Sequence, residues 1–128
     1  MEHIPIHETK THGTAAFPFT VYHGVIPELI PSFPLHWHED FELIYCVRGQ
    51  VLVTVWGQTY KLCAGDLAVI LPRFAHSIDQ YSEETGEYYN IMFHPSLFKA
   101  AEDDPCYSKY VLHFLNGQKS MECFHGTD

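Results

Sequence analysis

Two histidines and a glutamate stand at spacings that could place them on one side of a β-strand. They are His36, His38 and Glu42. Side chains alternate between the two faces of a strand with a period of two, so these three point the same way if the step through residues 39–40 adds no bulge. Two imidazoles and a carboxylate suit a mid-series divalent metal ion. The spacing therefore favours a metal site over three unrelated surface residues.

A further histidine would complete this site. His76 is the natural candidate, because it lies just past the Gly65–Asp66 turn and Pro72. Such a set leaves coordination positions open to water or to an oxygen-rich molecule, which both metal catalysis and simple ligand binding use. The ligand types do not choose among Zn, Ni, Fe, Mn and Cu.

Short apolar runs separated by glycine turns predict the strands that position these residues. Gly57–Gln58 favours a two-residue hairpin turn with glycine first. Several short strands follow at intervals of about 8–12 residues, and no predicted helices alternate with them as in βαβ units. This pattern predicts an all-β sandwich or barrel. Besides the stretch that carries His36 and His38, the predicted strands are 20–25, 41–47, 51–56, 59–62, 67–71 and 87–93.

The two faces of the last predicted strand differ in polarity. Tyr89, Ile91 and Phe93 form the more apolar face and are predicted to lie in the core. Tyr88 and Asn90 stand on the more polar face, which could line a cavity. Trp37 and Trp56 offer flat apolar surfaces against which a sugar ring could stack. We therefore take Trp37, Trp56, Tyr88 and Asn90 as candidate ligand-binding residues.

The chain resembles the cupin family in two motifs. From His36 to Gly49 it reads H-x-H-x3-E-x6-G, which matches the first cupin motif, and Gly65 to His76 has the spacing of the second. The second motif departs from the family because Arg73 replaces the usual glycine. The resemblance implies a double-stranded β-helix, or jelly-roll barrel. It also implies that the metal ligands are His36, His38, Glu42 and His76.

A narrower resemblance is to the sensor domains of AraC-type transcription regulators, over roughly residues 20–98. It implies a small-molecule effector such as a sugar, an N-terminal arm that can fold over the ligand, and self-association. Small barrels also expose strand edges and apolar outer faces that need covering, so a homodimer is expected. The segments that carry the likeness are Pro34–His38, Phe41–Tyr45, Gly65–Leu67, Ile70–Pro72 and Phe93–Phe98.

The 128 residues are enough for one domain, which can bury about two thirds of its surface. We predict an extended arm over 1–19, a β-barrel over 20–94 and a C-terminal helix or extension over 95–128. In the last part, the apolar residues 107, 110, 111, 114 and 115 form one helical stripe. A hairpin about Asn116–Gly117 is the rival interpretation.

The amino-acid composition limits the classes of partner that the chain is expected to bind. Seven Lys and Arg against sixteen Asp and Glu give a formal charge of −9, and no basic patch suited to a phosphate backbone is visible, so the chain itself is not expected to bind nucleic acid. No apolar run approaches the roughly 20 residues that span a bilayer, and Met1–Pro5 lacks the pattern of a secretory signal. We expect no membrane association and a cytoplasmic location.

Two functions remain after these exclusions. The first is the ligand-sensing domain of an AraC-type regulator, and the second is a stand-alone metal-dependent cupin enzyme such as a dioxygenase, isomerase or lyase. About thirty residues follow Phe98, too few for the paired helix-turn-helix units of such a regulator. The closeness of residues 34–98 to the regulator pattern favours an excised sensor domain over the enzyme.

Overall fold

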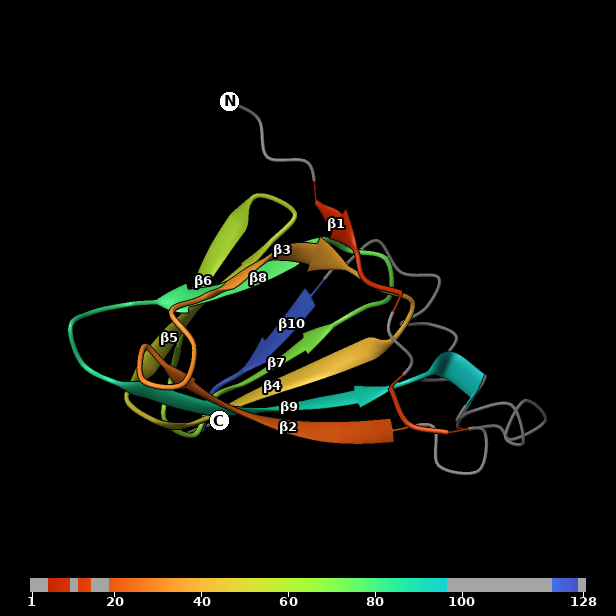
Figure 1. Ribbon diagram of the computed structural model, residues 1–128. Coiled ribbons are helices and arrows are strands. Elements are labelled where there is room, and N and C mark those ends of the chain that lie inside the picture. The colour runs from red at the N-terminus through yellow and green to blue at the C-terminus, as the bar shows by residue number, and fades with distance from the viewer. Residues whose placement is uncertain (1–4, 10–11, 15–18, 97–120, 127–128) are drawn as a thin grey trace.

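Two five-stranded β-sheets pack face to face in the computed structural model, which describes residues 5–9, 12–14, 19–96 and 121–126 (Figure 1). The strand order is β1-β3-β8-β5-β6 in the first sheet and β10-β7-β4-β9-β2 in the second. This arrangement confirms the predicted all-β jelly-roll barrel. The strands are β1 (Ile6–His7), β2 (Phe19–Ile26), β3 (Phe33–Trp37), β4 (Phe41–Arg48), β5 (Gln50–Val55), β6 (Gln58–Cys63), β7 (Leu67–Ile70), β8 (His76–Gln80), β9 (Gly86–Phe93) and β10 (Met121–Phe124).

The chain crosses repeatedly between the two sheets. β3 lies in the first sheet, β4 in the second, β5 and β6 in the first, β7 in the second, β8 in the first and β9 in the second. Residues that are close in sequence therefore face each other across the barrel interior. This alternation brings the ends of β3, β4 and β8 together at one end of the barrel.

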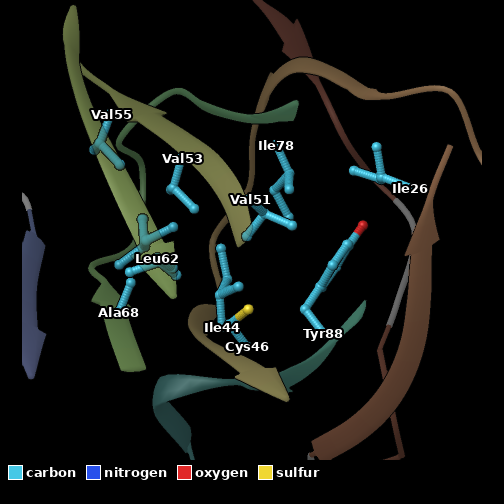
Figure 2. Packing of buried hydrophobic residues seen from close by; sticks show 11 residues of the cluster. Ile26, Ile44, Cys46, Val51, Val53, Val55, Leu62, Ala68, Ile78 and Tyr88 are labelled. Atoms are coloured by element: carbon cyan, nitrogen blue, oxygen red, sulfur yellow. The ribbon is translucent and has the colours of Figure 1, made fainter. Parts of the chain in front are cut away.

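The core fills the space between the sheets (Figure 2). Val51, Val53 and Val55 on β5 are each at most 1% exposed, as their period of two predicts. They meet Ile44 and Tyr88 of the second sheet within one cluster of buried residues. Each fully buried aliphatic side chain contributes about 1.5–3 kcal/mol to stability, so this cluster fixes how the two sheets face each other.

The prediction for the faces of β9 was wrong. Tyr88 and Met92 are 1% and 4% exposed and face the core, whereas Tyr89 is 38% exposed on the outside. The outer face of the second sheet is itself apolar, because Tyr89 pairs with Tyr45, and Ile91 pairs with Leu43. Hydrophobicity alone therefore could not distinguish the two faces of this strand.

The turn between β5 and β6 lies one residue earlier than predicted. Val55 pairs with Gln58, so the two turn residues are Trp56 and Gly57, with φ angles of 51° and 81°. Positive φ at both positions is the type I′ geometry, which requires glycine second rather than first. Trp56 thus adopts a left-handed conformation that L-residues other than glycine seldom adopt.

Three of the strands were not predicted, and the first of them, β1, lies in the stretch expected to be an extended arm. β8 begins at His76 and pairs with both β3 and β5, which places this histidine inside the first sheet. β10 pairs antiparallel with β7, within the stretch expected to be a helix or extension. The predicted helical stripe at 107–115 and the Asn116–Gly117 hairpin lie outside the described residues.

Replacing Gly49 is expected to destabilise the barrel far more than replacing Gly57. Both have positive φ, 67° and 81°, but a Cβ on Gly49 would collide with the backbone oxygen of Thr85, whereas one on Gly57 would meet nothing within 4 Å. Gly49→Ala should lower the free energy of unfolding by about 2–4 kcal/mol, and Gly57→Ala by about 1 kcal/mol. Urea denaturation measures both, and equal losses would contradict the crowding at Gly49.

Candidate metal centre

Four buried side chains converge where the two sheets meet at one end of the barrel. They are His36 on β3, His38 just after it, Glu42 on β4 and His76 at the start of β8. One potential ligand atom from each lies within 4.8 Å of the others, and no member is more than 6% exposed. The structure thus brings together the complete set of predicted metal ligands.

These residues do not share one ribbon, as the sequence spacing suggested. The chain passes from the first sheet to the second between His38 and Glu42, so the glutamate faces the histidines from the opposite sheet. His36 and His76 are direct partners in the β3–β8 pair. Opposition across the barrel, rather than alternation along a single strand, is what gathers the four groups.

Backbone carbonyl groups fix the orientation of all three imidazoles. The Nδ1 atom of His36 lies 2.8 Å from the oxygen of Pro34, that of His38 3.0 Å from Asp40, and that of His76 2.9 Å from Phe74. A carbonyl only accepts, so each Nδ1 carries the proton and donates. In a neutral ring held this way, the lone pair lies on Nε2, which is the tautomer that a metal requires.

Three atoms at the centre of this cluster have no hydrogen-bond partner among the described residues. They are Nε2 of His38, Nε2 of His76 and Oε2 of Glu42. The carboxylate oxygen lies 3.8 Å from Nε2 of His38 and in close contact with Nε2 of His76. A buried polar atom without a partner costs about 1–3 kcal/mol. A single cation would satisfy all three atoms, so the residues fit a divalent metal.

The electrostatics of the cluster favour an ionised Glu42 and a neutral His36, and they also favour a proton on His76 while no cation is present. Burial alone would raise the pKa of Glu42, but attraction to His76 and contacts with His38 outweigh it and hold the pKa well below its usual value. Burial, reinforced by repulsion from His76, lowers the pKa of His36. Burial opposes a charge on His76, yet the nearby carboxylate raises its pKa. At neutral pH Glu42 is ionised and His36 is neutral, as metal ligation needs.

Arg73 connects the loop before β8 to the chain just after β3. It stands where the cupin pattern has glycine, and its φ of 73° explains that preference. Its backbone N–H donates to the oxygen of His38 over 2.8 Å, and its Nε donates to Glu39 over 2.8 Å. The ion pair is solvent-exposed, so water screens it and it contributes little to stability. The backbone bond is what holds the His76 loop beside His38.

Three residues at the site carried no recognised sequence signal. His12 is only 7% exposed, with its ring edge towards His38 at a centroid distance of 6.3 Å. Its Nδ1 hydrogen-bonds the hydroxyl of Tyr22 over 2.7 Å, and its Nε2 contacts Glu8. Tyr22 pairs in register with Asn90. The period of two along β2 could have indicated Tyr22, but nothing in the irregular first residues marked Glu8 or His12.

The N-terminal segment is attached directly to β3, the strand that carries His36. β1 runs parallel to β3, with Ile6 opposite His36, and the N–H of Glu8 donates to the oxygen of Trp37 over 2.8 Å. The ring of His7 stacks on Trp37, with 3.8 Å between centroids and planes 4° apart. One face of the Trp37 indole is therefore already covered.

The other three candidate ligand-binding residues lie in three different environments. Asn90 reaches the metal centre, because its Nδ2 donates to Oε1 of Glu42 over 2.6 Å. Tyr88 belongs to the core cluster, and burial, with the charge of Glu42, raises the pKa of its phenol. Trp56 is 68% exposed at the β5–β6 turn and contacts Phe74 edge-on.

Comparison with solved structures supports the fold. A cupin 2 conserved barrel domain protein from Salinispora arenicola is 19% identical, with a TM-score of 0.55 over 68% of this chain and 72% of that one. The cupin domain of Cnp3 from Schizosaccharomyces pombe is 15% identical, with a TM-score of 0.57 over 67% and 63%. At these identities the likeness concerns the cupin fold alone.

Sequence relatives are more informative about the family. An uncharacterized HTH-type transcriptional regulator of Bacillus subtilis, YbfI, is 28% identical over 76% of this chain and 38% of its own length. A second one, YdeC, is 23% identical over 84% and 36%. The chain thus spans little more than a third of either relative.

The described part of the chain contains no helix long and apolar enough to cross a membrane.

Residues 31–126, which include all four members of the buried cluster, match the family described as the AraC-like ligand binding domain. That match covers well over half of the sequence. The chain therefore belongs to the AraC-like ligand-binding domain family, with a cupin fold.

Proposed function

We propose that this domain senses a small molecule through a divalent transition metal held by the four buried residues. The observation that carries the proposal is the set of three unpartnered ligand atoms, gathered from both sheets with every imidazole oriented by its other nitrogen. His36, His38, Glu42 and His76 would hold the ion. When bound, the ion would act as a Lewis acid whose open positions accept oxygen atoms of the effector.

The family favours a sensor over the enzyme alternative. The relatives YbfI and YdeC are named as HTH-type transcriptional regulators, and the chain corresponds to about a third of each. We infer that the domain supplies effector binding to a cytoplasmic regulator of this kind. Sugars are the first class of effector to test, because their hydroxyl groups can replace metal-bound water. The same centre would serve a stand-alone cupin enzyme, but the family assignment gives that use less support.

The N-terminal segment offers a means of reporting occupancy. Glu8 and His12 lie over the same end of the barrel as the metal ligands, and β1 pairs with the strand that bears His36. An effector bound at the metal would contact this N-terminal segment, so binding would change how strongly the segment is held against the barrel. This agrees with the arm movement that the resemblance to AraC-type sensors implies.

Protein purified without a histidine tag should contain about one equivalent of divalent metal per chain, because four oriented donors form one site. The double substitution His36→Ala and His38→Ala should reduce that content to background in elemental analysis. A matched double substitution of two exposed histidines, His23→Ala and His94→Ala, should leave it unchanged. Equal metal content in all three samples would indicate adventitious binding and contradict the proposal.

A monosaccharide panel tested by thermal shift should contain compounds that raise the melting temperature of the metal-loaded domain by several degrees. A ligand at one hundred times its Kd adds about 2.7 kcal/mol to stability. The shift should disappear in the His36→Ala and His38→Ala variant, and binding should slow hydrogen exchange at the N–H of Glu8. A shift of equal size in that variant would mean that the ligand binds elsewhere and would contradict metal-dependent sensing.

We also propose that the domain forms a homodimer through the outer face of the second sheet. Val21, Tyr45, Tyr89 and Phe124 are 52%, 40%, 38% and 48% exposed on four strands of that sheet, and exposed apolar side chains that share a sheet face can mark a protein–protein interface. Sedimentation at micromolar concentration should give twice the 14.8 kDa mass of one chain. Tyr45→Glu with Tyr89→Glu should shift the species to 14.8 kDa, and a wild-type monomer would refute the dimer.

A further inference from the structure

Asn90 is a polar residue on an otherwise apolar inner surface. Its neighbours on the same face of β9, Tyr88 and Met92, are 1% and 4% exposed, and Asn90 itself is 9% exposed. A buried amide requires hydrogen-bond partners, since burying it without them is unfavourable. The partner in this barrel is a residue of the metal centre.

The bond from Asn90 runs diagonally across two paired strands. In the β4–β9 register Asn90 stands opposite Ile44, whereas Glu42 stands opposite Met92. The Asn90 side chain therefore reaches past its direct partner to place Nδ2 2.6 Å from Oε1 of Glu42. A hydrogen bond to an ionised carboxylate is stronger than one between neutral groups, so it fixes the orientation of the Glu42 side chain.

The two carboxylate oxygens of Glu42 therefore make different contacts. Oε1 accepts the amide hydrogen, while Oε2 has no hydrogen-bond partner among the described residues and faces the Nε2 atoms of His38 and His76. A carboxylate can bind a metal through one oxygen or through both. With one oxygen held by an amide, only the other is directed at the centre.

We propose that Asn90 is a positioning residue that commits Glu42 to bind the metal through Oε2 alone. The inference rests on the metal site proposed above and adds a consequence for the effector. Three imidazole nitrogens and one carboxylate oxygen leave about two positions open on a six-coordinate ion. A glutamate bound through both oxygens would fill one of them. Asn90 thus preserves room for an effector that chelates through two oxygen atoms.

The test counts water molecules on Mn²⁺ bound to the purified domain, using the water-proton relaxivity of the metal complex. Wild-type protein should carry about two exchangeable waters. Asn90→Leu keeps the branching of the side chain at Cγ but removes the amide donor, and it should reduce that number to about one. It should also weaken the displacement of these waters by an added chelating hydroxy acid. Asn90→Gln, which keeps an amide, should retain more of the wild-type value than Asn90→Leu does.

Two further variants keep the test decisive. Met92→Leu changes the same inner face without touching the bond to Glu42 and should behave as wild type. Asn90→Val, with a β-branched side chain suited to a strand, replaces Asn90→Leu if that protein does not fold. Unchanged water number in folded Asn90→Leu or Asn90→Val would overturn the inference about Asn90 alone. If the wild type binds neither Mn²⁺ nor any other divalent ion, the result instead refutes the metal site.

Discussion

Placing three imidazoles and a carboxylate inside an apolar barrel would cost several kilocalories per mole if they were left without partners, and much of the local structure resolves that problem. The three Nδ1 atoms donate to carbonyls two residues away in the chain, and Asn90 donates to one carboxylate oxygen. Within the described part of the chain, the buried side-chain atoms that have no hydrogen-bond partner all lie at one point. Burying these atoms without partners is unfavourable, and a cation that binds among them would remove that cost.

The same requirement accounts for the geometry of the surrounding chain. His76 must begin β8 opposite His36, and the preceding loop is held beside His38 by the backbone bond from Arg73. Gly49 permits the chain to leave β4 in a left-handed conformation and enter β5, because no Cβ fits against Thr85. The barrel core fixes the separation of the sheets, and these turns fix where the ligands lie within that separation.

The sequence predicted much of this structure where residue type and spacing act together. The alternation in Val51–Val55 predicted β5. The cupin-like pattern of His36, His38, Glu42 and His76 predicted the members of the cluster, although they come from both sheets and not from one strand. Prediction from the sequence failed where a tertiary contact decides the outcome. The inward face of β9 was misassigned because the outer face of the second sheet is equally apolar. The contacts of Glu8 and His12 were missed because they depend on a two-residue strand that has no local pattern of its own.

The stacking of His7 on Trp37 has a practical consequence. The chain has two tryptophans, and they lie in unlike surroundings. The indole of Trp56 is mostly in water, whereas that of Trp37 is partly buried and covered by an imidazole from the N-terminal segment. The ultraviolet emission of Trp37 therefore depends on whether that imidazole stays in place. The protein carries its own optical reporter of the segment that lies beside the buried His/Glu cluster.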